Sequence, residues 1–167
     1  GQSVPIVIAI TAEVQREKEL PFNIGFAVPW GAVKCKISED RNSAEFSITR
    51  DSKPWSGIHL YTKGKIKMTE LKNKKDAALV FDIRGGKDLF GRQSSACKLS
   101  LHGILGLKRK NVNLNRYISN FWETVRIPFA DIDPDASKYG DFHGLTFQFH
   151  NVPSAGVELR NIRITYQ

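Results

Sequence analysis

The chain has 167 residues, of which 41% are hydrophobic, and a formal net charge of +8 at neutral pH. This length suits one domain with a sizeable core, and the apolar content excludes a disordered chain. The positive charge favours anionic partners but does not bear on the fold. The longest apolar run near the start, VPIVIAI, is far shorter than the ~20 residues that a helix needs to span a bilayer.

Short alternating segments, separated by Gly, Pro, Asn and Asp, dominate the chain. Alternation over a few residues is typical of a strand with one buried face. The sequence predicts one short helix at residues 11–20, with Thr11 as its N-cap and Pro21 after its end. The predicted strands lie near residues 5–10, 32–37, 44–49, 57–62, 77–84, 97–102, 121–127, 144–150 and 156–166. This pattern predicts an all-β chain, an antiparallel two-sheet β-sandwich of jelly-roll type that forms a single domain over residues 1–167.

The stretch FWETVRIPFADI (residues 121–132) raises the question of what Trp122 does. Val125 and Ile127 share the inward face of the predicted strand, and Pro128 ends it. Trp122 has the opposite parity, but burying so large a ring stabilises a fold by several kcal/mol. We therefore interpret Trp122 as a plug over the end of the core, with an exposed binding platform as the alternative.

Several of these motifs resemble a known family. W-x-x-V-x-I-P-F (122–129), GLTFQFH (144–150) and GVELRNIRI (156–164) look like the end of a galactose-binding-like jelly-roll module. The order KPWSGIHLY (53–61), then DAALVFDIR (76–84), is similar to the C-terminal module of bacterial glycoside hydrolase family 3 exo-glucanases. The resemblance covers roughly residues 30–166 and leaves residues 1–29 unplaced.

The resemblance implies a non-catalytic module of a bacterial polysaccharide-degrading enzyme, either secreted, periplasmic or on the cell surface. Such a module binds a polysaccharide or packs against the catalytic domain of its own parent chain. Many of these modules hold a structural calcium ion through an Asp just before the last strand. Here Arg160 stands before Asn161 at that place, and a cation there argues against calcium.

The outward positions of the predicted strands supply a candidate carbohydrate-binding surface. Aromatic rings lie against the C–H faces of sugars, and planar polar groups pair with sugar hydroxyls. If the strands keep one register, a polar outer face collects Trp55, His59, Tyr61, Asp82, Arg84, Lys98, Ser100, His102, Gln148 and His150. The alternative is an ordinary solvated sheet face.

Turn-like segments supply a second candidate site, at one end of the sandwich. Trp30, Phe90 and Tyr117 are aromatic residues in such segments, and Arg92 and Arg116 lie beside two of them. Each of these aromatics could equally cover the core.

Signals for metals, catalysis and nucleic acid are weak. Asp131, Asp133 and Asp135 have calcium-loop spacing, but Ala136 and Phe142 replace the required Gly and Glu. We also expect no zinc site from His59, His102 and His150, and no other cofactor. Asp82 is the only acid on the predicted face, so hydrolysis has no carboxylate pair and we expect no enzyme. The basic residues are spread over separate connections, which argues against nucleic-acid binding.

Cys35 and Cys97 allow at most one internal disulfide, and we favour two buried thiols over the disulfide. For function, we expect binding of a β-glucan-type polysaccharide. The alternatives are binding of an acidic or sulfated polysaccharide, which the net charge favours, and a purely structural module that docks on its catalytic domain.

Overall fold

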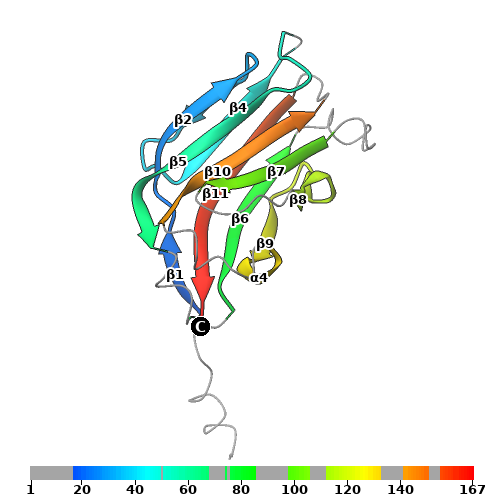
Figure 1. The fold of residues 1–167 in the computed structure, drawn as a ribbon. Coiled ribbons are helices and arrows are strands. Elements are labelled where there is room, and N and C mark those ends of the chain that lie inside the picture. The colour runs from blue at the N-terminus through cyan, green and yellow to red at the C-terminus, as the bar shows by residue number, and fades with distance from the viewer. Residues whose placement is uncertain are drawn as a thin grey trace, which may run out of the picture.

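The computed structural model describes residues 17–49, 51–67, 74, 76–85, 98–105, 112–132, 141–150 and 155–167. Nearly all the described secondary structure is strand, arranged in two antiparallel sheets (Figure 1). A 3₁₀ turn at Asn115–Tyr117 and a single α-turn, α4 (Phe129–Ile132), are the helical segments of this part of the chain. Neither has the length or apolar character that a membrane-spanning helix needs.

The six-stranded sheet is built around the last strand. Its order is β3 (Lys34–Ile37), β4 (Ser43–Ile48), β11 (Ala155–Tyr166), β6 (Ala78–Gly85) and β9 (Glu123–Pro128). β1 (Lys18–Pro21) pairs with the second half of β11, while β4 pairs with its first half. The register of β11 against β6 shifts between Arg160 and Arg163, where Asn161 has a positive φ of 53°.

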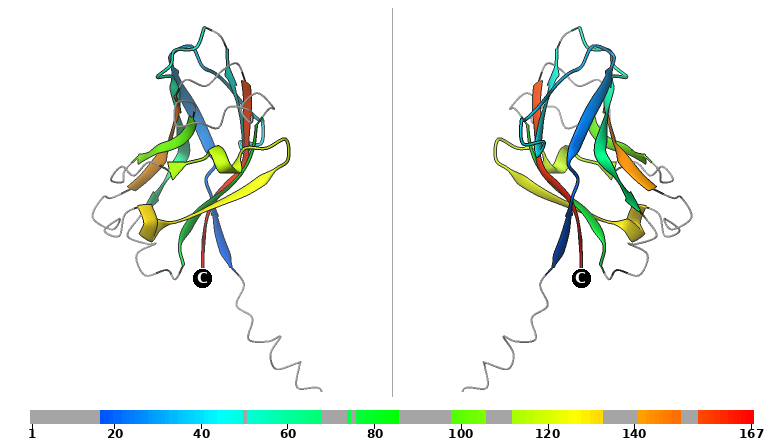
Figure 2. Two further views of the ribbon diagram at one scale, coloured as in Figure 1. Left: turned by 90° about the vertical axis from the view of Figure 1, so that its right-hand side faces the viewer. Right: turned by 90° about the vertical axis from the view of Figure 1, so that its left-hand side faces the viewer.

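The five-stranded sheet has the order β2, β5, β10, β7, β8. Its strands are β2 (Ile24–Trp30), β5 (Gly57–Lys67), β10 (Asp141–His150), β7 (Lys98–Leu105) and β8 (Val112–Asn113). Views turned by 90° show the two sheets as separate layers (Figure 2). β2 lies at the edge of its sheet and pairs with β5 alone.

The core fills the space between the two sheets, as alternation requires. Inward side chains of β6 and β10, including Phe81 and Phe147, are fully buried. The Phe147 ring lies 5.6 Å from the Phe46 ring and 6.1 Å from the Phe81 ring, so one residue of the five-stranded sheet contacts two strands of the other. The structure thus confirms the predicted all-β, antiparallel two-sheet sandwich.

At the start of the chain, one predicted element is wrong over part of its length, and another lies outside the described residues. The predicted helix at residues 11–20 is wrong over its second half, because Lys18–Pro21 forms β1 and pairs with Arg163–Tyr166. Pairing with β11, which is far away in the sequence, overrides the local helical pattern of these residues. Residues 11–16 and the predicted strand at residues 5–10 lie outside the described residues.

The sequence prediction also missed β2. Gly25 and Pro29 indicate turns when the sequence is considered alone. In the structure Gly25 sits where the β2–β5 register shifts, and Pro29 is tolerated because β2 is an edge strand.

Cys35 lies in β3 as a free thiol and packs against the core. Burial raises the pKa of this thiol to about 11. Cys97 lies outside the described residues.

Replacing Phe147 by Ala should reduce the free energy of unfolding by about 3–5 kcal/mol, because the ring has no solvent exposure and its loss leaves a cavity. Denaturant-induced unfolding measures the change. Phe121→Ala is the matched control, since Phe121 is 78% exposed, and its effect should stay within about 0.5 kcal/mol. Equal losses for the two variants would contradict the described core.

Candidate functional site

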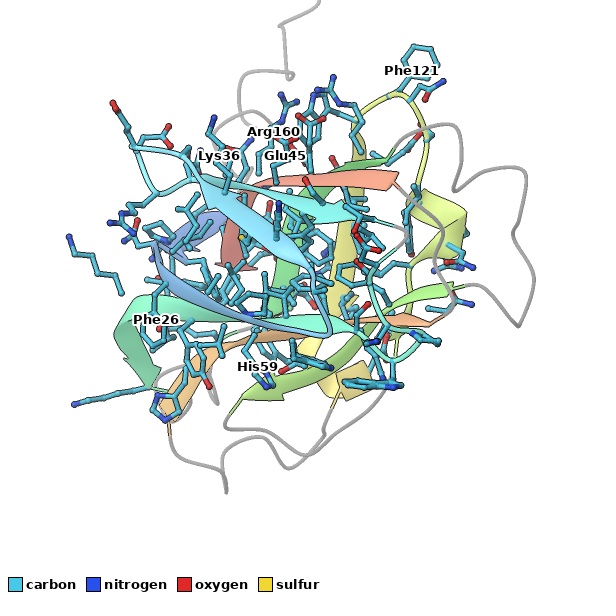
Figure 3. The ribbon with its side chains drawn as sticks, turned by 90° about the horizontal axis from the view of Figure 1, so that it is seen from above. Phe26, Lys36, Glu45, His59, Phe121 and Arg160 are labelled. Carbon is cyan, nitrogen blue, oxygen red and sulfur yellow. The ribbon has the colours of Figure 1, made fainter. Side chains whose placement is uncertain are left out.

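Aromatic side chains gather on the outer face of the five-stranded sheet, along its β2–β5 edge. We call this the aromatic surface and define it by Phe26, Trp30, Trp55, His59 and Tyr61. Phe26 and Trp30 come from β2, His59 and Tyr61 from β5, and Trp55 from the loop before β5. Figure 3 shows Phe26 and His59 on one side of the sandwich, and Lys36, Glu45 and Arg160 on the other.

Strand register brings these rings together. Phe26 is paired with Tyr61, and their rings stack with centroids 4.7 Å apart and an interplanar angle of 14°. The rings of Trp30 and His59 lie 4.8 Å apart, and those of His59 and Tyr61 6.1 Å apart. Trp30 lies four positions after Phe26 in β2, so the rings form a row about 13 Å long, given ~3.3 Å per strand residue.

Two contacts hold Trp30 at the end of the row. Its Nε1–H donates a hydrogen bond to the Trp55 carbonyl at 2.8 Å. Its six-membered ring lies over Gly57, where an added Cβ would come within 2.2 Å of the indole. Gly57 therefore leaves room for the indole to lie over the backbone of β5.

Polar groups from β10 lie beside the rings. A hydrogen bond of 2.8 Å joins His59 Nδ1 to Thr146 Oγ1. Gln148 lies in register with Gly57, and its half-buried side chain has the outward parity of Thr146. The surface thus combines ring faces with imidazole and amide groups, which suits a ligand with apolar faces and hydroxyls.

The aromatic surface also leaves apolar area uncovered. Exposed fractions are 55% for Phe26, 44% for the neighbouring Val28 and 57% for Trp55. Among the described residues only one other large hydrophobic side chain, that of Phe121, is exposed. A concentration of exposed apolar side chains on one face is typical of an interaction site.

The structure brings together some of the residues that the sequence predicted, but not all. His59, Tyr61 and Gln148 share this face, and Trp30, predicted in a loop, joins them from β2. Trp55 lies in the loop beside them, where its backbone carbonyl accepts the hydrogen bond from the Trp30 indole. Lys98, Ser100, His102 and His150 belong to β7 and β10 of the same sheet, but their side chains lie outside the described part. Phe90 and Arg92 are wholly outside it.

Asp82 and Arg84 are not part of this face, which corrects the prediction of one shared surface. Both lie on β6, so they point outward from the six-stranded sheet on the opposite side of the sandwich. The prediction that both side chains point outward from their strand is correct, but alternation within a strand does not tell which sheet that strand joins. Arg84 pairs with Glu158 at 2.6 Å, and Asp82 accepts a hydrogen bond from Thr124 Oγ1 at 2.9 Å.

The interpretation of Trp122 as a core plug is wrong. Its half-exposed ring lies outside the core and contacts the guanidinium groups of Arg84 and Arg160, 4.6 and 4.0 Å from the ring centroid. Tyr117, by contrast, packs against the core, with the Arg116 guanidinium 4.6 Å over its ring. It covers the core and does not join the aromatic surface.

Phe26 and Val28 were missed by sequence reasoning because β2 was not predicted. The signal was present: FAVPW alternates from Phe26 to Trp30 despite its proline. For metals, no three His, Cys, Asp or Glu side chains in the described ranges lie close enough to share an ion. Arg160 and Asn161, where the resemblance places a calcium ligand, lie inside β11 and contact the Asp82 carboxylate.

Solved structures with a similar fold are carbohydrate-binding modules. The family 30 module of the cellulosomal cellulase Cel9D-Cel44B of Clostridium thermocellum matches with a TM-score of 0.53 and 14% identity, covering 88% of this chain and 96% of the module. A second family 30 module matches with a TM-score of 0.50 and 13% identity, covering 89% and 81%. The chain has the jelly-roll fold of carbohydrate-binding modules. No protein-family model and no curated protein sequence matches it.

Gly57→Ala should displace the Trp30 indole and destabilise the sheet, because the new Cβ would also lie 2.6 Å from the Phe147 carbonyl oxygen. Near-ultraviolet circular dichroism and thermal unfolding measure the two effects. Gly64→Ala is the control in the same strand, since nothing lies within 4 Å of its added Cβ. An unchanged tryptophan signal in Gly57→Ala would contradict the described indole position.

Proposed function

We propose that the chain is a non-catalytic carbohydrate-binding module that binds a β-glucan-type polysaccharide along the aromatic surface. The observation that carries the proposal is the row of rings from Phe26 to Trp30, extended by the exposed Trp55. A β-linked glucan presents the flat C–H faces of successive sugars, which can lie against rings placed in a row. Gln148 and His59, whose ring is held by the bond to the buried Thr146, supply groups for the hydroxyls.

The fold and one neighbour's source support this ligand class. The family 30 module is named as part of a cellulase, an enzyme whose substrate is a β-glucan. We propose by the same reasoning that this module belongs to an exported polysaccharide-degrading enzyme of bacterial origin. The resemblance to the C-terminal module of family 3 exo-glucanases suggests the kind of parent chain.

Tyr61→Ala and Trp30→Ala should each weaken binding of a mixed-linkage β-glucan at least tenfold. Truncating an aromatic anchor at a binding hot spot costs about 2 kcal/mol or more, and ~1.4 kcal/mol is a factor of ten. Affinity electrophoresis and isothermal titration calorimetry measure the loss. Phe121→Ala, an exposed phenylalanine away from the aromatic surface, should bind as the original chain does.

The dependence of affinity on salt concentration distinguishes binding of a neutral glucan from binding of an acidic or sulfated glycan. Contacts through rings and uncharged polar groups are insensitive to ionic strength, whereas exposed charge pairs are screened within ~10 Å at 0.1 M salt. We expect β-glucan affinity to change less than twofold between 50 mM and 500 mM NaCl. A preference for a sulfated polysaccharide that disappears at high salt would favour the acidic-glycan alternative.

The exposed Phe26, Val28 and Trp55 would also suit docking on a catalytic domain, which is the structural alternative. A glycan array covering neutral and acidic polysaccharides distinguishes the two. If the folded chain bound no glycan on that array, polysaccharide binding would be rejected and docking on a catalytic domain would remain.

A further inference from the structure

A hollow lies on the outer face of the six-stranded sheet. Three of its lining residues, Lys36, Glu45 and Arg160, lie on the opposite side of the sandwich from Phe26 and His59 of the aromatic surface (Figure 3). The hollow has a volume of about 230 Å³ and is walled by Trp122 and by outward side chains of β3, β4 and β11. Its polar lining comes chiefly from Lys36, Ser38, Ser43, Glu45, Glu158 and Arg160. A neighbouring hollow of about 340 Å³ shares Glu45 and Glu158 with it and includes Arg84.

A row of charges crosses this face in strand register. Lys36 is paired with Glu45, Glu45 with Glu158, and Glu158 with Arg84. Like charges directly opposite each other, as in Glu45 and Glu158, destabilise a sheet. Arg84 relieves this by binding Glu158 at 2.6 Å, whereas the Glu45 carboxylate has no ion pair or hydrogen bond to any described residue. An acceptor is therefore available beside the hollow.

Donors are available beside it too. Arg160 uses Nε for its contact with Asp82 at 3.3 Å, which leaves its two Nη groups without a bond to described residues. The Lys36 ammonium likewise has no partner among the described residues and is exposed. Unpaired donors and an unpaired acceptor thus line the same small space.

The Trp122 ring, Arg84 of β6 and Arg160 of β11 form a wall of side chains that hold one another in place. Glu158 holds Arg84, and Asp82 holds Arg160, while both guanidinium groups contact the Trp122 ring. Asp82 is fixed in turn by Thr124 Oγ1 at 2.9 Å and Asn161 Nδ2 at 3.2 Å. Side chains that are already ordered lose less conformational entropy when a ligand binds.

The charges around this wall balance. Of the residues that line the hollow, Lys36 and Arg160 are basic and Glu45 and Glu158 are acidic, so the site has no net charge to favour an anion or a cation. The volume is below the ~300–1,000 Å³ of pockets for drug-sized ligands, so the occupant is small. We propose that this hollow is a second sugar-binding site, which takes a neutral mono- or disaccharide unit through Trp122, Glu45, Lys36 and Arg160.

The consequence is a module with two binding faces on opposite sides of one sandwich. A single copy could then hold two glycan chains at once. This inference does not depend on the aromatic surface, because none of its residues lies there.

The test uses the Trp30→Ala/Tyr61→Ala variant, in which the aromatic surface is disabled, and follows its nuclear magnetic resonance signals. Glucose, galactose, mannose and cellobiose are titrated singly, with glucuronic acid as the charged comparison. At least one neutral sugar should shift the Trp122 indole and the Glu45 and Arg160 amides saturably, and glucuronic acid should bind more weakly. Adding Glu45→Gln and Lys36→Met should reduce the affinity at least fivefold.

Glu39→Gln is the matched control, because Glu39 is an exposed glutamate that does not line the hollow, and it should leave the affinity unchanged. The proposal is overturned if no neutral sugar shifts these signals, if glucuronic acid binds more tightly, or if Glu45→Gln/Lys36→Met binds as before. A negative result in this titration would not bear on binding at the aromatic surface. A negative result with β-glucan at the aromatic surface would likewise not bear on this hollow.

Discussion

Contact between the inward phenylalanines of the two sheets fixes where every outward side chain points. Phe147 of one sheet lies against Phe46 and Phe81 of the other, and these rings have no solvent exposure. Because strand side chains alternate between faces, locking Phe147 inward places Thr146 and Gln148 outward. In β5 the same alternation buries Ile58 and Leu60 and turns His59 and Tyr61 outward, so the burial that stabilises the fold also presents the site.

The two outer faces that result differ in chemistry. The face of the five-stranded sheet carries stacked rings and exposed apolar side chains, of which Phe26 and Trp55 are the most exposed. On the six-stranded sheet, a row of two acids between two bases runs across neighbouring strands, and Trp122 lies against two arginines. Stacked rings suit a long, regular glucan, whereas a balanced ring of charges around a small hollow suits a single sugar unit. The two proposed binding sites therefore lie on opposite sides of the core.

The alternation in residues 77–84 and 144–150 was enough to predict two strands, their buried sides and the sandwich. It placed Phe81 and Phe147 inward and Asp82 and Gln148 outward, as found. It could not assign these strands to sheets, since pairing depends on partners far away in the chain. β6 and β10 lie in different sheets, so residues predicted on one face are divided between two.

Local sequence signals also gave wrong predictions where contacts with residues far away in the chain determine the structure. Gly25 and Pro29 indicated turns, yet they are accommodated by a register shift and a sheet edge, and β2 contributes Phe26 and Trp30 to the site. Trp122 was assigned to the core on the energy of burying an indole. Cation–π contacts with Arg84 and Arg160 provide another way to stabilise a half-exposed ring, and no sequence pattern predicted them.

We propose that a glucan lies along the β2–β5 edge of the five-stranded sheet. Mapping the backbone and indole resonances of the whole chain during titration with a mixed-linkage β-glucan hexasaccharide tests it most directly. The largest shifts should fall on Phe26, Trp30, Trp55, His59 and Tyr61, with smaller shifts at Gln148. Shifts confined to other loops, or none at saturating hexasaccharide, would contradict it.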